Sequence, residues 1–239
     1  DTSSTPRLLI SDAKRTRALA VLQYLRSLPP FSFLSRKTLA VVTGLLQSLT
    51  AATPGNSGCT FLRRLYDVIH DGATSLLPTD PAYYYSQVEI SAEAWKDLDW
   101  WEHILGEPDF GARQHNVLAT LVATWGDGSG TGTGGTLQTH TTTGSSSQME
   151  MWMGVWSHAV HSSTSNWKEL RTLLETIQRE RLSSRFRGVM LLYFTDNMVT
   201  YELINRGSSS SPGLQDLLRE IKSLEISLQC HLIAIHVPG

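Results

Sequence analysis

Hydrophobic residues recur at helical spacing through the first 105 positions of the chain. Each such stripe predicts an amphipathic helix, because positions three and four apart share one helical face. Four stripes follow one another, and they span Leu19–Leu25, Leu39–Leu49, Phe61–Ile69 and Trp95–Leu105. Serines at positions 11, 35 and 91 precede three of them as N-cap residues. The pattern predicts a small helical bundle, in which Tyr83-Tyr84-Tyr85 fits either a strand edge or a nucleic-acid contact.

Beyond Pro108 the pattern changes to apolar runs that are typical of strands. These runs cover residues 117–125, 149–157, 189–195 and 230–237, and helical stripes begin near Ser165 and Ser211. The expected order is strand, hairpin, strand, helix, strand, helix, helix, strand. Such interleaving predicts an α/β fold, a mixed sheet flanked by helices. We therefore expect a helical domain at 1–108 and an α/β domain at 109–239.

Residues 126–147 are almost entirely Gly, Thr and Ser. A segment of this composition is flexible or forms a hairpin, and we expect it to pack little because its side chains are small. It is unusual beside a strand that carries functional groups, so we interpret it as a degenerate or inserted hairpin.

Composition and charge narrow the function classes. The 239 residues are 41% hydrophobic and 18% charged, with a formal net charge of −2. These values are typical of a soluble globular protein and argue against binding that depends on phosphate contacts over the whole surface. Lysines and arginines do cluster locally, at positions 14–17, 63–64 and 179–187, where solvated helix faces are the simpler interpretation.

Targeting signals are also absent from the pattern. Cys59 and Cys230, in no metal-binding spacing, predict a reducing intracellular compartment, the cytoplasm or the nucleus. No apolar run reaches the ~20 residues that span a bilayer, so we expect no membrane partner. The N-terminus has neither an initiator Met nor a signal-peptide pattern, which indicates a fragment or a processed product.

Two of the predicted strands end in an aspartate, Asp127 and Asp196. Functional groups collect at the carboxyl ends of parallel strands, so adjacent strands would bring both carboxylates to one edge of the sheet. Glu169, in the second turn of the helix between them, can reach the same edge. Converging carboxylates repel one another unless a cation lies among them, and hard oxygen ligands suit Mg²⁺. The spacing thus indicates a candidate site for metal-assisted phosphodiester hydrolysis.

Each of these acids also has a purely structural interpretation. Asp127-Gly128 fits a hairpin turn, Glu169 fits an early-helix acid favoured by the helix dipole, and Asp196 fits a helix N-cap. The spacing alone leaves both interpretations open.

The order of short sequence words around the acids adds a family resemblance. Gly126-Asp127-Gly128-Ser129, Asn166-Trp167-Lys168-Glu169-Leu170 and Phe194-Thr195-Asp196-Asn197 are similar to the ribonuclease H of retroelements. Ile204-Asn205-Arg206-Gly207, Ser211-Pro212 and His236-Val237-Pro238-Gly239 resemble DIRS-like (tyrosine-recombinase) retrotransposons more specifically. In the helical half, Gly44-Leu45-Leu46, Phe61-Leu62-Arg63-Arg64-Leu65-Tyr66 and Ala94-Trp95-Lys96-Asp97-Leu98-Asp99-Trp100-Trp101 resemble the thumb and connection segment of that reverse transcriptase.

The resemblance implies a ribonuclease H-like domain that hydrolyses RNA in an RNA–DNA hybrid with two Mg²⁺ ions, or with Mn²⁺ in their place. It implies four carboxylates, and Asp127, Glu169 and Asp196 match three of them as catalytic residues and metal ligands. Ser129, Asn166 and Asn197 lie close enough in sequence to these carboxylates to be candidates for contacts with the nucleic acid, although turn and cap roles fit them equally well. The expected partners are the hybrid or another nucleic acid, and the rest of the reverse transcriptase polyprotein or a larger assembly.

The fourth family carboxylate lies beyond the His236–Gly239 word, where this sequence stops, and the polymerase palm is absent. We therefore expect no DNA synthesis by this chain and keep three hypotheses: a ribonuclease H-type endonuclease, a truncated or domesticated non-catalytic scaffold, and a generic α/β domain. Trp95, Trp100 and Trp101 could stack on bases, but at this helical spacing they are interpreted as interdomain packing. His236 could lie near the site, but at the end of a strand it is interpreted as a surface residue.

Overall fold

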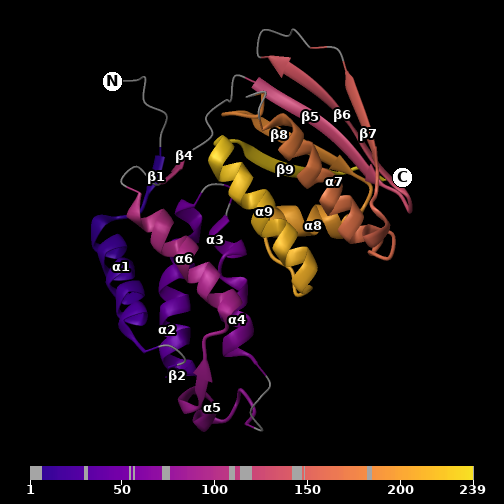
Figure 1. The fold of residues 1–239 in the computed structure, drawn as a ribbon. Coiled ribbons are helices and arrows are strands. Elements are labelled where there is room, and N and C mark those ends of the chain that lie inside the picture. The colour runs from indigo at the N-terminus through magenta and orange to yellow at the C-terminus, as the bar shows by residue number, and fades with distance from the viewer. Residues whose placement is uncertain are drawn as a thin grey trace, which may run out of the picture. The chain divides into compact units, whose positions relative to one another are not determined.

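The structure is a computed structural model, which describes residues 7–29, 32–53, 55, 57–71, 76–107, 111–113, 120–141, 147, 149–181 and 185–238. The chain divides into two compact units (Figure 1), Arg7–Arg113 and Gln114–Gly239, the second of which also takes in Asp1–Pro6. The sequence-based boundary at 108–109 lies a few residues before this division. In the described part of the chain, no helix is both long enough and apolar enough to cross a membrane.

The first unit consists of short helices with two small antiparallel strand pairs, β1 with β4 and β2 with β3. Its elements are β1 (Arg7–Leu9), α1 (Asp12–Ser27), β2 (Phe33–Ser35), α2 (Arg36–Gln47), η1 (Thr50–Ala52), α3 (Ser57–Thr60), α4 (Arg63–Ile69), α5 (Pro81–Tyr85), β3 (Gln87–Glu89), α6 (Ala92–Gly106) and β4 (Gly111–Arg113). The three tyrosines lie in helix α5, which is capped by Asp80 and has Pro81 in its first turn. The expectation of a strand edge there is wrong.

The core of this unit explains its tryptophans. Trp101 is fully buried, and its indole Nε1 donates to the carbonyl of Phe61 at 2.9 Å. Trp100 stacks on the Phe61 ring at 4.0 Å, and Trp95 packs against the same cluster. Their burial is thus explained within their own unit, and the interdomain role expected for them is not needed to account for it.

The second unit is built on a five-stranded mixed sheet with the strand order β7-β6-β5-β8-β9. Its elements are β5 (Thr120–Gly128), β6 (Gly132–Thr141), β7 (Glu150–Val155), η3 (His158–Val160), α7 (Ser165–Glu180), β8 (Met190–Thr195), α8 (Met198–Arg206), α9 (Pro212–Leu228) and β9 (His231–His236). Strands β5 to β7 form antiparallel pairs, whereas β8 runs parallel to both β5 and β9. The element order and the fold class, a mixed sheet flanked by helices, are those predicted.

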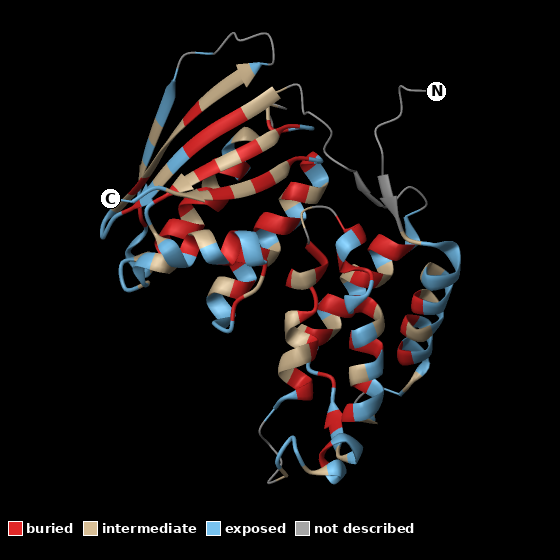
Figure 2. Cartoon of the chain, turned by 180° about the vertical axis from the view of Figure 1, so that it is seen from behind, coloured by how far each residue is buried: buried red, intermediate tan, exposed pale blue. Residues whose placement is uncertain are grey.

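One face of the sheet carries the core. Along β8 and β9 buried positions alternate with half-buried ones (Figure 2), as expected of strands covered on one side. The core joins this face to the apolar stripes of α7 and α9, with Val122, Leu173, Tyr193, Leu218 and Leu232 among its members. The helices thus fix the sheet from one side.

Two contacts hold the edge strand β9. The amide of Asn205, on α8, donates to the carbonyl of Ala234 and accepts from its N–H, both at 3.0 Å, so it pairs with the free strand edge. Glu225, on α9, accepts from the N–H of Leu232 at 2.9 Å and forms a buried ion pair with Lys222 at 2.7 Å. Both contacts set the position of β9.

The opposite face is apolar and partly open to solvent. Trp125 stacks on Phe194 with ring centres 4.6 Å apart. Further out, Met151, Met153 and Val155 of β7 are 79%, 87% and 86% exposed. Among the described elements, the helices that pack on the sheet do so on the other face.

The Gly/Thr/Ser-rich segment is an ordered hairpin strand over its described part. Within β6, Thr133 and Leu137 are buried, so the expectation that it packs little is wrong. Gly135 must lack a side chain, because a Cβ there would lie 2.7 Å from the Trp125 carbonyl and 2.8 Å from Nε1 of Trp152. Residues 142–146 of this segment lie outside the described residues.

Gly128 lets helix α7 come close to the end of β5. A Cβ at this position would lie 2.7 Å from the carbonyl carbon of Lys168 and 2.9 Å from its oxygen. Backbone atoms cannot yield as a flexible side chain can, so any larger residue must push strand and helix apart.

We expect Gly128→Ala to lower the free energy of unfolding by about 1–3 kcal/mol, the usual effect of overpacking. Urea unfolding measures the change. Gly130→Ala is the matched control, since a Cβ there meets no atom within 4 Å, and it should change stability by no more than about 0.5 kcal/mol. Equal stability of the two variants would contradict the close approach.

Candidate active site

The parallel pairing of β5 with β8 brings two aspartates to one end of the sheet. Trp125 pairs with Phe194, and each aspartate lies two residues further along its own strand. Asp127 and Asp196 line one hollow of about 560 Å³ together with those two rings. Both aspartates are exposed. The two strands are adjacent, which is the condition for a shared site of the two aspartates.

The structural interpretations of the two aspartates are wrong. Asp127 is paired with Gly134 inside the β5–β6 ladder, and the turn begins after it. The N-cap of α8 is Asn197, whose side chain accepts from the N–H of Thr200 at 3.0 Å. Neither carboxylate is therefore needed to form a turn or a cap.

Glu169 reaches the same end of the sheet from α7. Thr164, which accepts from the N–H of Trp167 at 3.3 Å, caps this helix, so Glu169 lies in its second turn. Its side chain is buried, with 5% of the residue exposed. The N–H of Gly128 donates to its carboxyl group, and the carboxyl of Asp127 lies within hydrogen-bond reach. Its Oε2 atom has no partner among the described residues.

Burial and negative neighbours favour the protonated form of Glu169. Desolvation is the largest cause, followed by the charge and hydrogen bond of Asp127 and the charge of Asp196, and together they raise the pKa of Glu169 to about 7. The Gly128 N–H opposes this shift. Two carboxyl oxygens within hydrogen-bond reach require a proton or a cation between them. Glu169 therefore carries a proton below about pH 7 in the absence of a cation.

The phenol of Tyr193 is buried next to the three acids. It is fully buried, and its hydroxyl lies 3.4 Å from the carbonyl of Gly126. Burial, with the nearby charges of Glu169, Asp127 and Asp196, raises its pKa well above the ordinary value. The phenol stays neutral and belongs to the core between the sheet and α7.

The donor set fits a hard divalent cation, although the side chains are not arranged around one. Three carboxyl groups, one with an orphaned buried oxygen, offer the oxygen ligands that Mg²⁺ takes. Within the described residues, no group of three or more His, Cys, Asp or Glu side chains is disposed to hold a metal ion as it stands.

The three predicted nucleic-acid contacts neighbour the acids in the chain: Ser129 lies two residues after Asp127, Asn166 three before Glu169, and Asn197 directly after Asp196. The hydroxyl of Ser129 is engaged in its turn, donating to the carbonyl of Gly132 and accepting from its N–H. Asn197 donates through its Nδ2 atom to Oδ1 of Asn166 at 2.9 Å. Cap and turn roles are thus present for Ser129 and Asn197, and their contacts with nucleic acid stay predictions.

Two residues near the site had no clear signal in the sequence. Lys168 is buried, and its ammonium donates to the carbonyls of Gly130 at 3.2 Å and His161 at 3.1 Å, which anchors the β5–β6 turn to α7. His236, interpreted as a surface residue, has its Nε2 atom 3.2 Å from the carbonyl of Asp196. A lysine or histidine beside polar residues is ordinarily solvated, so only the fold reveals these contacts.

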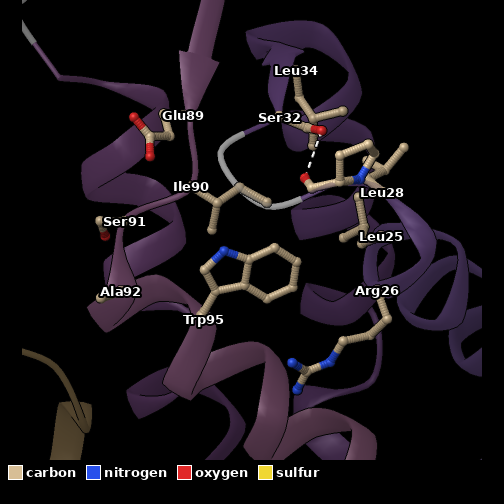
Figure 3. Close-up of a pocket in the computed structure, with 11 residues that line it drawn as sticks. Leu25, Arg26, Leu28, Ser32, Leu34, Glu89, Ile90, Ser91, Ala92 and Trp95 are labelled. Atoms are coloured by element: carbon tan, nitrogen blue, oxygen red, sulfur yellow. Dashed lines mark hydrogen bonds between the residues drawn. The ribbon is translucent and has the colours of Figure 1, made fainter.

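The helical unit contains a hollow of its own, of about 430 Å³ (Figure 3). Trp95, Ile90, Leu25 and Leu34 supply an apolar lining, and the Arg26 guanidinium lies 5.3 Å from the Trp95 ring centre. Arg26 is also ion-paired with acids of α6, namely Asp99 and Glu102. Among its described lining residues the one carboxylate is Glu89, so the hollow lacks the converging acids of the sheet site.

Comparisons with known proteins find a likeness in solved structures alone. No family model matches the chain, and no curated protein matches it. The compost-derived ribonuclease H1 LC11 matches with a TM-score of 0.36 and 12% identity, over 51% of this chain and 86% of that one. Ribonuclease H1 of the archaeon Halobacterium salinarum gives 0.36 and 14%, over 49% and 86%. A foamy viral protease-reverse transcriptase in complex with double-stranded DNA gives 0.33 and 12%, over 97% of this chain and 43% of that one. At these scores and identities the likeness supports no conclusion about function.

We expect Glu169→Gln to be more stable than the parent above neutral pH in metal-free buffer. With a pKa raised from 4.5 to about 7, Glu169 contributes stability that is complete below pH 4.5 and lost as pH rises through 7. Glutamine stays neutral, so the gap between the two proteins should open over this range. At pH 8.5 it should reach about 1–3 kcal/mol, because one pKa unit corresponds to about 1.4 kcal/mol.

Urea unfolding from pH 5 to 8.5 in the presence of a chelator measures this gap. Glu220→Gln, at an exposed position of α9, controls for the loss of one negative charge. A gap that stays constant with pH would contradict the raised pKa.

Proposed function

We propose that the α/β unit is the ribonuclease H-type nuclease domain of a DIRS-like retroelement reverse transcriptase. In this proposal it hydrolyses the RNA strand of an RNA–DNA hybrid with Mg²⁺, or with Mn²⁺ in its place. The supporting observation is the convergence of Asp127, Glu169 and Asp196 from two parallel strands and one helix. The sequence words around these acids supply the family, and the helical unit corresponds to the thumb and connection segment.

The chain's own residues would prepare the site for the ions. Asp127 and Asp196 are exposed and face the substrate side, whereas Glu169 is buried behind them. The three carboxyls would hold the metal, with the Gly128 N–H orienting the carboxyl of Glu169. When bound, paired ions activate a water for attack on the phosphodiester and stabilise the leaving oxygen. Glu169 must lose its proton before the ions bind.

Polar residues that neighbour the acids in the chain would recognise the hybrid through its backbone and sugars. A ribonuclease that acts on any sequence needs contacts to phosphates and 2′-hydroxyls, which carry no base information. Ser129 lies two residues after Asp127, and Asn166 lies three before Glu169. They are our candidates for these contacts.

A non-catalytic scaffold is the second candidate. The observation that favours it is the arrangement of the acids, since no three of the described His, Cys, Asp or Glu side chains are disposed around a metal ion. The open apolar face beside the acids, with Met151 and Met153 largely exposed, would then serve a protein partner. Measurements of cleavage and metal binding separate the two functions.

Asp196→Asn should abolish Mg²⁺-dependent cleavage of an RNA–DNA hybrid, with a loss of roughly 100-fold or more, because a metal ligand is lost. Since Asp196 is exposed, the melting temperature should not fall. The measurement follows a labelled RNA strand in the hybrid, and Glu220→Gln is the matched control. Equal cleavage by Asp196→Asn and the parent would remove the site assignment, and a parent that never cleaves the hybrid would favour the scaffold.

Mg²⁺ should stabilise the parent at pH 8, and Asp127→Asn should lose this gain. An ion present at about 100 times its Kd adds about 2.7 kcal/mol to the native state. The gain should shrink as pH falls through about 7, the pKa of Glu169, because protons then compete with the ion. Thermal unfolding at constant ionic strength, with K⁺ as the control ion, measures it. The same gain in both proteins would show that Mg²⁺ binds elsewhere.

A further inference from the structure

Two asparagines that neighbour the acids in the chain are joined by a side-chain hydrogen bond. Asn166 lies in the first turn of α7, three residues before Glu169, and Asn197 directly follows Asp196. Their side chains meet in one hydrogen bond, from Nδ2 of Asn197 to Oδ1 of Asn166 at 2.9 Å. This bond links α7, which carries Glu169, to the N-cap of α8, which directly follows Asp196.

The backbone of α8 fixes the direction of this hydrogen bond. The N–H of Thr200 can only donate, and it does so to Oδ1 of Asn197 at 3.0 Å. The NH₂ group of Asn197 must therefore face Asn166, whose oxygen accepts. No described residue accepts a hydrogen bond from the NH₂ group of Asn166, which is half-buried. That group is the part of the side chain left for a ligand.

We propose that Asn197 is a positioning residue that holds Asn166 as a hydrogen-bond donor toward the nucleic acid. The inference rests on the proposed function and specifies the substrate group that Asn166 recognises. A fixed NH₂ donor matches an acceptor on the backbone or sugar of a strand, such as a phosphate oxygen or a 2′-hydroxyl oxygen. Asn197 acts through Asn166 and makes no substrate contact of its own.

The variant Asn197→Ser separates the two roles of Asn197, the N-cap of α8 and the hydrogen bond that positions Asn166. A serine hydroxyl is a good N-cap, so Asn197→Ser retains the start of α8. Its side chain is one group shorter and lacks the amide, which removes the bond to Asn166. Asn166→Ala removes the proposed donor itself.

Binding is measured by fluorescence anisotropy of a labelled RNA–DNA hybrid, with Ca²⁺ replacing Mg²⁺. One net hydrogen bond is worth about 0.5–1.5 kcal/mol, so Asn166→Ala should weaken binding about two- to twelvefold. Asn197→Ser should weaken it by up to the same factor with an unchanged melting temperature. The double variant should bind no more weakly than Asn166→Ala alone, because both changes remove one contact.

Three results would overturn the proposed positioning of Asn166 by Asn197. Additive losses of affinity in the double variant would mean that Asn197 contacts the hybrid directly. If Asn166→Ala binds the hybrid weakly but Asn197→Ser binds it as tightly as the parent, Asn166 needs no positioning. Parental binding by Asn166→Ala would remove the donor itself. If the parent protein binds no hybrid, the proposed function is rejected, and with it the positioning of Asn166 that rests on it.

Side-chain amide resonances give a readout independent of affinity. In the parent, the NH₂ of Asn166 should shift on addition of the hybrid, while that of Asn197 stays unchanged. In Asn197→Ser the free protein should show faster solvent exchange and a changed shift of the Asn166 amide. An Asn166 resonance that is the same in both proteins would contradict the positioning role.

Discussion

Three mutually repelling carboxyl groups are held together at one end of a β-sheet, and the packing around them resists their separation. The β5–β8 pairing fixes Asp127 and Asp196 side by side, and the missing Cβ of Gly128 lets α7 bring Glu169 beside them. The sheet ladder and the core beneath it offset this repulsion. A proton on Glu169 relieves it in the absence of metal, and a divalent cation would do the same.

The acids have a closed, buried side and an open, apolar side. On the side of α7 the site is closed by buried groups, the Tyr193 phenol and the Lys168 ammonium among them. On the other side it opens into a hollow shared with Trp125 and Phe194, beside the exposed methionines of β7. In the proposed nuclease, a strand of nucleic acid would approach the exposed aspartates; in the alternative scaffold, the apolar face beside them would take a protein segment.

The element order of the α/β unit followed from hydrophobic periodicity, because each apolar run had to be buried on one face of the sheet. The errors arose where composition was used without tertiary partners. Residues 126–147 were expected to pack little, yet Gly135 is small because Trp152 lies against it. Tyr83 was open to a strand role, but Pro81 and the Asp80 cap start a helix there.

The sequence by itself determined the order of strands and helices in the α/β unit, and it placed an aspartate at the end of two strands and a glutamate early in the helix between them. The two strand pairs of the first unit were not predicted. The sequence left open whether Asp127 formed a turn and whether Asp196 formed a cap. The structure decided both. Asp127 is in a strand because it pairs with Gly134 of β6, and Asp196 is not the cap because the backbone of α8 places Asn197 at that position. The raised pKa of Glu169 and the direction of the Asn197–Asn166 bond also required the fold, since burial and hydrogen-bond polarity belong to the assembled site.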